Sequence, residues 1–418
     1  MQESSTSAGA SVTSAGSGRG EKSTADVVVA GHICLDIIPQ LNSTQQRPGD
    51  LFVPGGLVHI GPATVALGGC VANTGQALHQ LGSKTRLVGK VGDDLLGKTI
   101  LESLRELHPS LPESMVVASG EATSYTIVLS PPGVDRGFLH CSGANDTFHA
   151  DDLRTSAFAH ARILHFGYPP LMRSILADAG RSLALRFADA QVAGLLVTLD
   201  MAMPAAGSGA APIDWTQWLT NVLPHVDIFL PSYDELSLLL PDVASDRTAG
   251  AGVDLQQLDK FATTLLRYGV PIVVIKLGEQ GLYLRTGSQV TLLSRRAAWH
   301  NFDWQAWSNR ELLAPCFEVA VVGTTGSGDC TIAGFLMALL QGAGPEAALR
   351  LATAVGAHCV ESADATSGIP SCSRVEARLN SDWPRRPMAN AWSHWRLDAE
   401  FGVYAAPRDA SVVPQTAS

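Results

Sequence analysis

Short apolar strand patterns alternate with helical stretches along most of the chain, and this alternation limits the folds that the chain can adopt. The run Asp26–Ala30 is a strand pattern that ends at Gly31, and residues 72–81 have helical spacing up to Gly82, a residue type that often follows a helix. Further strands are predicted at 84–88, 163–166, 194–199, 227–230 and 271–276, and further helices at 99–107, 174–190, 215–223, 233–240 and 255–266. Strands separated by helices form parallel βαβ units, so the sequence predicts an α/β fold with a doubly wound, mainly parallel sheet flanked by helices.

Two segments interrupt the alternation, at 41–60 and 115–145. Both are rich in Val, Thr, Gly and Pro and contain turn signals, which predicts a small β-sheet. In a parallel sheet the ligand crevice lies at the carboxyl ends of the strands, where a small sheet can act as a lid. We therefore predict a main α/β domain from residues 24–40, 61–114 and 146–385, with a β lid from the two interrupting segments.

The two ends of the chain have a different composition from the rest. Residues 1–23 consist mainly of Ser, Gly, Ala, Thr and Glu without an apolar run, which predicts a disordered tail rather than a signal peptide. Residues 386–418 form a C-terminal extension, predicted to be partly disordered because the stretch after about Ala405 has a loose composition. No segment approaches the run of about 18 apolar residues that a membrane span requires, so no membrane partner is expected.

Composition excludes several classes of function. Hydrophobic residues make up 46% of the chain and charged residues 16%, so a large core can form. The net charge of −10 argues against nucleic acid as a main partner. The seven cysteines are odd in number and never spaced C-x-x-C, which is typical of reduced thiols in a cytoplasmic enzyme without a zinc site.

One segment near the carboxyl end of this pattern carries candidate chemistry. Val319–Val322 reads as a strand, Gly323–Gly328 as a glycine-rich loop, and Asp329 as the start of a helix that ends at Gly342. Backbone N–H groups of such a loop converge at a helix N-terminus and can hold an anion. A carboxylate beside them can take a proton from a hydroxyl group, so the segment suits phosphoryl transfer, although the same pattern also occurs as an ordinary helix start.

The sequence resembles the ribokinase-like (PfkB) carbohydrate kinases. Residues 323–335 (GTTGSGDCTIAGF) are similar to the family signature D-T-x-G-A-G-D-x-F-x-A-G-F. Residues 31–36, 68–73 and 89–97 resemble further family motifs and occur in the family order. The resemblance runs from about residue 26 to 370 and implies a ribokinase-like fold.

The resemblance implies ATP-dependent phosphorylation of a hydroxyl group on a sugar or sugar acid, with Mg²⁺ as the metal. It makes Asp329 the base and gives the anion hole to Gly326, Ser327 and Gly328. The remaining implied assignments are sugar binding by Asp36, Gly68, Gly69 and Asn73, nucleotide binding by Lys276, Gly278 and Thr325, and Mg²⁺ binding near Glu235. Arg136 in the lid is a candidate contact for a substrate carboxylate or phosphate, and relatives often pair through their lids, so a homodimer is expected.

The sequence departs from the family pattern at several positions. Gly323 replaces an Asp that, in some relatives, helps to organise a monovalent cation, so dependence on K⁺ stays open. Ser232 replaces the Asn of an N-x-x-E motif whose Glu235 is kept, which predicts altered metal geometry. Cys70 stands where ribose kinases carry Lys, which weakens ribose as the substrate.

The sequence suggests three other functions. Gly92–Thr99 satisfies the P-loop pattern, but Asp93 and Asp94 would place two carboxylates inside a phosphate cradle, so we reject it. A nucleoside kinase of the same family is conceivable because Trp299, Trp304 and Trp307 could stack on a base, although a hydrophobic patch in an insertion, or a subunit contact, is the simpler explanation. A sugar-binding regulator without catalysis is the third, given the substitutions at positions 323 and 232.

Overall fold

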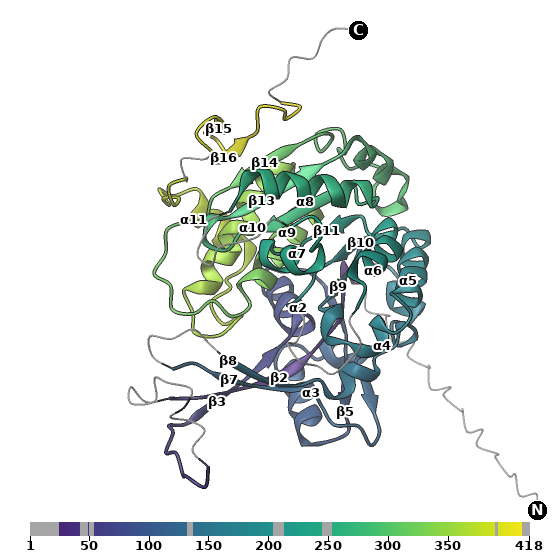
Figure 1. Ribbon diagram of the computed structural model, residues 1–418, viewed down its shortest axis with the longest axis vertical. Helices are drawn as coiled ribbons and strands as arrows, with labels where there is room; N and C mark the ends of the chain where they lie inside the picture. Colours follow the sequence, from purple (N-terminus) through teal and green to yellow (C-terminus); the bar gives the residue numbers. More distant parts are fainter. Residues whose placement is uncertain are drawn as a thin grey trace, which may run out of the picture.

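A ten-stranded sheet forms the centre of the molecule (Figure 1). The computed structural model describes residues 25–41, 49, 54–131, 137–203, 213–244, 253–388 and 392–411. The strand order is β15-β16-β14-β13-β12-β11-β10-β9-β1-β4, and the six strands from β12 to β4 run parallel while the others are antiparallel. The strands are β1 Val27–Gly31, β4 Thr85–Val88, β9 Ile163–Gly167, β10 Leu196–Leu199, β11 Ile228–Phe229, β12 Ile272–Lys276, β13 Leu282–Thr286, β14 Glu311–Ala314, β15 Arg396–Asp398 and β16 Val403–Ala405.

Helices cover both faces of this sheet, which confirms the doubly wound prediction. Successive side chains of a strand point to opposite faces, so Val27 and Val29 lie in one hydrophobic core while Val28 and Ala30 lie in the other. The first core includes residues of α2 Cys70–Gln80, α3 Leu95–Leu107, α9 Ser327–Leu340, α10 Pro345–Val360 and α11 Cys372–Leu379. The second includes residues of α4 Arg173–Leu176, α5 Arg181–Val192, α6 Trp215–Val222, α7 Tyr233–Leu239 and α8 Leu255–Arg267.

The stretch predicted as one helix over 174–190 is two helices, α4 and α5. Ala179 and Gly180 between them have positive φ angles of 56° and 77°, which a continuing right-handed helix does not allow. A Cβ atom on Gly180 would lie 2.7 Å from the indole nitrogen of Trp218. Close packing on α6 therefore requires glycine here, and the chain turns at this point.

A separate four-stranded sheet, here called the lid, lies at one end of the molecule (Figure 1). Its order is β3-β2-β7-β8, with β2 Cys34–Pro39, β3 Ala63–Gly68, β7 Tyr125–Leu129 and β8 Gly137–Cys141. The first two strands thus come from residues assigned to the main domain from sequence, rather than from 41–60. From 115–145, β6 Val116–Ala118 pairs instead with β5 Lys90–Gly92 in a two-stranded sheet.

Residues 319–322 are not the predicted strand. Val321 and Val322 are 58% and 64% exposed, and the strand before α9 is β14 instead. A short apolar run has the same composition whether it packs in a core or lines an open cavity, so periodicity alone does not separate the two. Helix α9 begins at Ser327, two residues before Asp329, and ends at Leu340 with Gly342 at φ 81°, as the glycine predicted.

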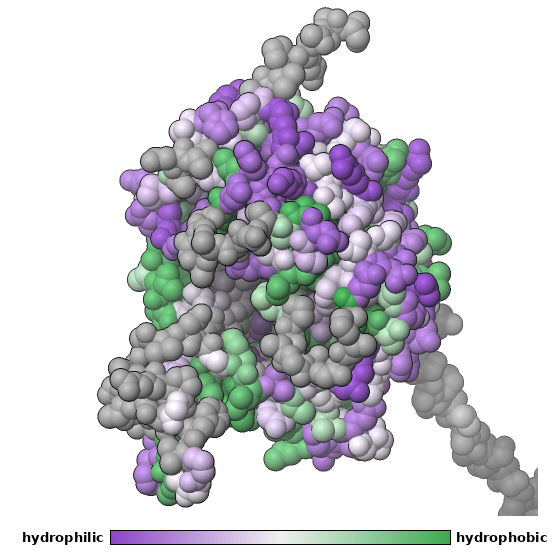
Figure 2. Space-filling view, in the orientation of Figure 1, coloured by the Kyte–Doolittle hydropathy of each residue, from purple (hydrophilic) through white to green (hydrophobic). Residues whose placement is uncertain are grey.

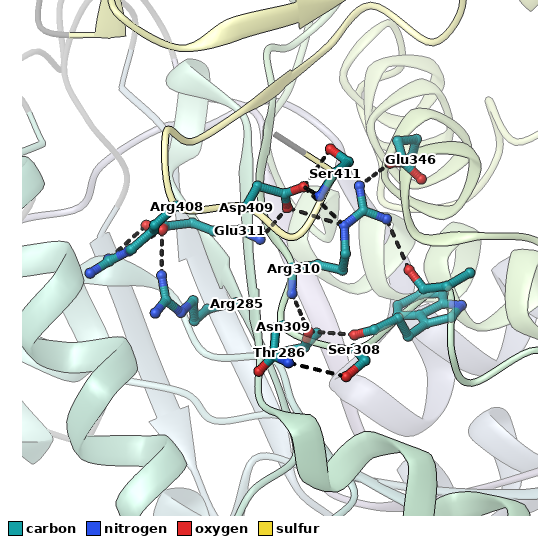
Figure 3. Close-up of polar contacts among 12 residues, drawn as sticks. Arg285, Thr286, Ser308, Asn309, Arg310, Glu311, Glu346, Arg408, Asp409 and Ser411 are labelled. Atoms are coloured by element: carbon teal, nitrogen blue, oxygen red, sulfur yellow. Dashed lines mark hydrogen bonds and ion pairs between the residues drawn. The ribbon is translucent and has the colours of Figure 1, made fainter. Parts of the chain in front are cut away.

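The described part of the C-terminal extension contains two strands and a buried carboxylate. Strands β15 and β16 extend the large sheet, and Asp409 beyond them is completely buried against Arg310. Figure 3 shows this cluster, in which Arg310 contacts both Asp409 and Glu346. A buried ion pair that spans distant parts of the chain leaves no periodic signal in the sequence.

The tryptophan segment and the P-loop pattern both have ordinary structural roles. Trp299, Trp304 and Trp307 are at most 2% exposed and belong to the core, so they form neither a surface patch nor a platform for a nucleobase. In the P-loop pattern, Asp94 caps α3 by accepting a hydrogen bond from Gly97 N (2.9 Å), as an ordinary helix start does. No helix in the described ranges is both long and apolar enough to cross a membrane.

Candidate active site

The N-terminus of α9 faces the carboxyl ends of the central parallel strands. Tyr168 follows β9, Asp200 follows β10, and Lys276 ends β12. Gly326 caps α9 with φ 71°, and a Cβ atom there would lie 2.4 Å from Cβ of Ala365. Glycine is therefore required at the turn that aims the first N–H groups of α9 into the crevice.

Asp329 lies in the first turn of α9 and is 2% exposed. Its Oδ2 accepts hydrogen bonds from Asn73 Nδ2 (3.0 Å) and Tyr168 OH (2.7 Å). Its Oδ1 accepts one longer bond from Thr74 Oγ1 (3.4 Å). Oδ2 is thus held by two short bonds, and Oδ1 has the larger remaining capacity to accept a proton.

Burial raises the pKa of Asp329 above its ordinary value, because the charged form loses its hydration. The hydrogen bonds from Asn73 and Tyr168 and the charge of Lys276 oppose this effect by stabilising the carboxylate. Tyr168 itself stays protonated, since burial and the neighbouring Asp329 charge raise the pKa of its phenol. The site therefore contains an acceptor that is more basic than an exposed carboxylate.

Lys276 places a buried ammonium group beside the same helix turn. Its Nζ contacts Asp200 Oδ1 at 2.5 Å, and it would lie 3.6 Å from a Cβ atom on Gly328. Burial alone would lower the pKa of Lys276, but the charges of Asp200 and Glu235 outweigh it and hold that pKa above its ordinary value. Burial also raises the pKa of Asp200, to about 8, against the opposing charge of Lys276. Lys276 therefore keeps its ammonium charge beside several carboxyl groups.

The residues predicted to bind sugar lie around the same carboxylate. A Cβ atom on Gly68 would lie 2.4 Å from Oδ2 of Asp36, so glycine is needed for the close approach of β3 to that side chain. Gly69, at φ 83°, precedes α2, whose residue Asn73 contacts Asp329. Burial raises the pKa of Asp36, and repulsion by the nearby Asp329 charge adds to this shift.

The lid presents one row of side chains to the sugar side of the site. Register pairs Asp36 with Thr126, and Thr126 with His140, so these three side chains share a face of the lid. Thr126 Oγ1 lies 3.0 Å from His140 Nδ1. The His140 ring is 5.2 Å from that of His32, and the His32 ring is 6.0 Å from that of Tyr168.

Two buried polar groups at this place lack partners among the described residues. They are Asn73 Oδ1 and both ring nitrogens of His32, which is 2% exposed. Burial lowers the pKa of His32 to about 3, so the ring is neutral and has one donor and one acceptor. Buried polar atoms are normally hydrogen-bonded, so these atoms are suited to a bound polar ligand.

A cavity of about 690 Å³ opens on the other side of the α9 turn. Its walls include the predicted Lys276, Gly278, Ser327 and Gly328, together with the exposed Val321. Thr325, the other residue predicted to bind nucleotide, is not among the lining residues, whereas its neighbour Thr324 is. The carbonyl oxygen of Thr325 accepts a hydrogen bond from the Cys359 thiol (3.4 Å). The predicted sugar and nucleotide residues thus lie on opposite sides of one helix turn.

The predicted metal residue Glu235 has a structural role in the cap of α7. Its Oε2 accepts from Ser232 N (2.7 Å), and Ser232 Oγ accepts from Glu235 N (3.2 Å), which is a capping box. Within the described residues, no three His, Cys, Asp or Glu side chains form a group that could hold a metal. Arg136, the predicted lid contact, lies outside the described residues.

Sequence reasoning did not identify Tyr168, Thr74 or His32 as site residues. Tyr168 has a recognisable signal, because it lies two residues after the strand predicted at 163–166 and so is close to the carboxyl edge of the sheet. Thr74 is next to Asn73 on α2, but an α-helical neighbour is as often turned away from a site as toward it. His32 lies in the first strand-end motif, where only the fold shows that its ring is unpartnered.

Several curated proteins of similar sequence are named as sugar kinases. Residues 24–372 match the family described as pfkB family carbohydrate kinase. An uncharacterised sugar kinase of Archaeoglobus fulgidus is 26% identical over 293 residues, which cover 70% of this chain and 98% of the relative. The structure of Arabidopsis thaliana ribokinase complexed with ribose and ATP is similar with a TM-score of 0.64 and 21% identity, covering 86% of this chain and all of that one. A putative ribokinase II from E. coli, in complex with ATP and Mg²⁺, has a TM-score of 0.61 and 19% identity over 85% of this chain and 99% of its own.

Proposed function

We propose that this chain, which belongs to the pfkB family of carbohydrate kinases, transfers the γ-phosphoryl group of ATP to a hydroxyl group of a sugar or sugar acid, with Asp329 as the base. Family membership establishes a sugar kinase; the acceptor and the residue roles are proposals. One observation carries the assignment of roles. The buried Asp329 carboxylate contacts Asn73, which has an unpartnered Oδ1, and it lies in the same helix turn as Ser327 and Gly328, which line the 690 Å³ cavity.

The acceptor hydroxyl is deprotonated on the polar side of the turn. Asn73 and Tyr168 hold Oδ2 of Asp329, so the carboxylate is fixed in orientation and Oδ1 receives the proton. Asn73 Oδ1, Asp36 and His32 then accept from, or donate to, other hydroxyl groups of the sugar. This arrangement brings the oxygen nucleophile close to the base, as general base catalysis requires.

The transferring group is stabilised on the other side of the turn. The helix N-terminus formed by Gly326, Ser327 and Gly328 lies beside the Lys276 ammonium, which is 3.6 Å from the position of a Cβ atom on Gly328. Positive charge and N–H donors there stabilise the negative charge that spreads over the phosphoryl oxygens. Thr324, Gly278 and the apolar wall around Val321 bind the remainder of the nucleotide.

Mg²⁺ fits this site as an ion carried mainly by the nucleotide. Among the acidic groups near Lys276, Asp200 is paired with Lys276 and Oε2 of Glu235 is used in the cap of α7, which leaves Oε1 of Glu235. Glu235 would hold the ion through water, consistent with the preference of Mg²⁺ for water and phosphate oxygens. When bound, the ion neutralises phosphate charge. Gly323 has no carboxylate, so this position of the loop supplies no side-chain ligand for K⁺. Dependence on K⁺ is tested by comparing activity in K⁺ and Na⁺ salts.

Measuring ADP formation with a panel of hexoses, pentoses, keto-deoxy acids and nucleosides tests this function. We expect turnover with a sugar or sugar acid in the presence of ATP and Mg²⁺. Calorimetry with the same panel covers the regulator alternative, since sugar binding without ADP formation would contradict the kinase. Turnover with nucleosides alone would contradict a sugar acceptor, and the buried tryptophans already remove the reason for that alternative.

The pH profile follows from the raised pKa of Asp329. The base must be ionised, so kcat/KM is expected to fall as pH drops through that pKa, at a higher pH than an exposed Asp would give. Replacing Tyr168 with Phe removes a hydrogen bond that favours the ionised form, so the acid limb is expected to move up by about one pH unit. The neutral His32 does not titrate in this range. A downward shift, or none, would contradict Asp329 as the base.

We also propose that two copies pair through the outer face of the lid. Register places Val65, Ile37, Ile127 and Leu139 in one row, on the face opposite Asp36. Val65 and Leu139 are 53% and 47% exposed, and hydrophobic side chains are exposed around β8 (Figure 2). A sheet face with such an apolar row is suited to burial against a second copy.

Light scattering coupled to gel filtration tests this pairing. We expect a dimer that Leu139→Glu converts to monomers, because the charge would be buried in the interface. Leu185→Glu is the matched control, since Leu185 is 69% exposed on α5 and far from the lid in the fold. A wild-type monomer, or a dimer that both variants leave intact, would exclude pairing through this face.

A further inference from the structure

A segment beyond the family match forms part of the wall of the nucleotide cavity. The match ends at residue 372, and Trp383–Pro387, here called the strap, follows α11. The strap pairs with the chain before α9: Glu318 N donates to Pro384 O (2.9 Å) and Arg386 N donates to Cys316 O (2.8 Å). An antiparallel bridge between Phe317 and Arg385 lies between these two bonds. The strap is thus an added, short strand along one edge of the cavity.

Side chains hold the strap in place on both sides. Trp383 stacks on Phe317 with ring centroids 4.3 Å apart, and its indole nitrogen donates to Glu318 O (3.1 Å). The Arg385 guanidinium lies 4.1 Å from the centre of the Phe317 ring and donates to Phe401 O (3.0 Å). The Arg378 guanidinium packs on the Trp383 ring, 3.6 Å from the centre of that ring. These contacts fix the backbone of the strap, so Arg386 projects from a rigid support.

Arg386 and Pro387 line the cavity opposite Lys276. Among the described side chains that line it, Lys276 and Arg386 are the cationic ones. Lys276 is already paired with the buried Asp200, whereas Arg386 pairs with Glu279 (3.0 Å), and these two side chains are 44% and 74% exposed. Exposed ion pairs contribute little stability, about 0–1 kcal/mol, so Glu279 can be exchanged for another anion at low cost.

We propose that Arg386 is a nucleotide-binding residue that leaves Glu279 and binds a phosphate group shared by ATP and ADP. This inference rests on the proposed function. A nucleoside polyphosphate brings several negative charges into this cavity, whose wall includes Lys276 and the first residues of α9. A guanidinium binds phosphate oxygens through charge-assisted, often bidentate hydrogen bonds, which are stronger than its exposed contact with one carboxylate. When no nucleotide is bound, the ion pair with Glu279 keeps the Arg386 side chain at the cavity.

Calorimetric titration with ADP, together with ATP-dependent kinetics, tests the proposal. For Arg386→Gln we expect the Kd for ADP and the KM for ATP to rise by the same factor, about tenfold or more, with kcat within about threefold of wild type. For Glu279→Gln we expect ADP to bind as tightly as to wild type or more tightly. Arg374→Gln, an exposed change on α11 outside the cavity, is the matched control and should change neither value.

The outcomes separate this inference from the function that it rests on. If wild-type protein does not bind ADP, the proposed function fails. If wild type binds ADP and Arg386→Gln binds it equally well, only the role of Arg386 is overturned. A fall in kcat with unchanged ADP affinity overturns it as well. Thermal unfolding checks that Arg386→Gln folds, as expected for a half-exposed side chain whose recorded partner is also exposed.

Discussion

Replacing Asp329 with Asn is expected to lower kcat roughly 10³-fold while the protein keeps its fold. The amide oxygen can take the place of Oδ2 and accept from Asn73 and Tyr168, and the amide nitrogen can face the Thr74 hydroxyl, which accepts. The variant therefore loses the basic oxygen without losing its neighbours. ADP release under saturating sugar and ATP measures the effect, and thermal unfolding verifies the fold.

Lys98→Ala is the matched control for this experiment. Lys98 would be the catalytic lysine of the rejected P-loop, but it is exposed in the first turns of α3, whose start is capped by Asp94. We expect its replacement to leave kcat and KM unchanged. The reverse pattern, with activity lost in Lys98→Ala and kept in Asp329→Asn, would refute the assignment of the base. Calorimetry should show that Asp329→Asn still binds nucleotide, which separates loss of chemistry from loss of binding.

The parts of the fold that could be predicted are those with local periodicity. The strand at 27–31, the helix that ends before Gly82 and the helix that ends before Gly342 all carry an apolar pattern and a glycine stop, and the structure has them. Because parallel strands place their carboxyl ends together, residues that follow strands were expected to meet at one edge. Asp200, which follows β10, and Lys276, which ends β12, contact each other there at 2.5 Å.

The parts that could not be predicted depend on long-range packing. The lid takes β2 and β3 from residues that read as the main domain, since strand pairing is a choice of partner that composition does not reveal. Val321 and Val322 have strand propensity but are more than half exposed, and Val321 lines the open cavity. The surroundings of the His32 ring could not be predicted either, because the rings beside it belong to Tyr168 and His140, which are distant in the sequence.

The C-terminal extension contributes to stability through a buried ion pair. Arg310 Nε lies 3.1 Å from Asp409 Oδ2, and the exposed fractions of the two side chains are 8% and 0%. Asp409 also accepts from Glu311 N (2.7 Å) and Ser411 N (2.8 Å), so one carboxylate joins β14 to the last described residues (Figure 3). The extension is therefore a structural part of the large sheet, and breaking this contact should affect the whole domain.

Replacing Arg310 with Met is expected to lower the free energy of unfolding by about 3–5 kcal/mol, because the buried Asp409 loses its paired cation while the volume of the side chain is largely kept. Urea denaturation followed by fluorescence measures the loss. Arg105→Met is the matched control: the Arg105–Glu102 pair on α3 is more than half exposed on both sides, so its loss should cost less than about 1 kcal/mol. Equal, small effects of the two substitutions would show that the Arg310–Asp409 pair does not hold the extension on the sheet.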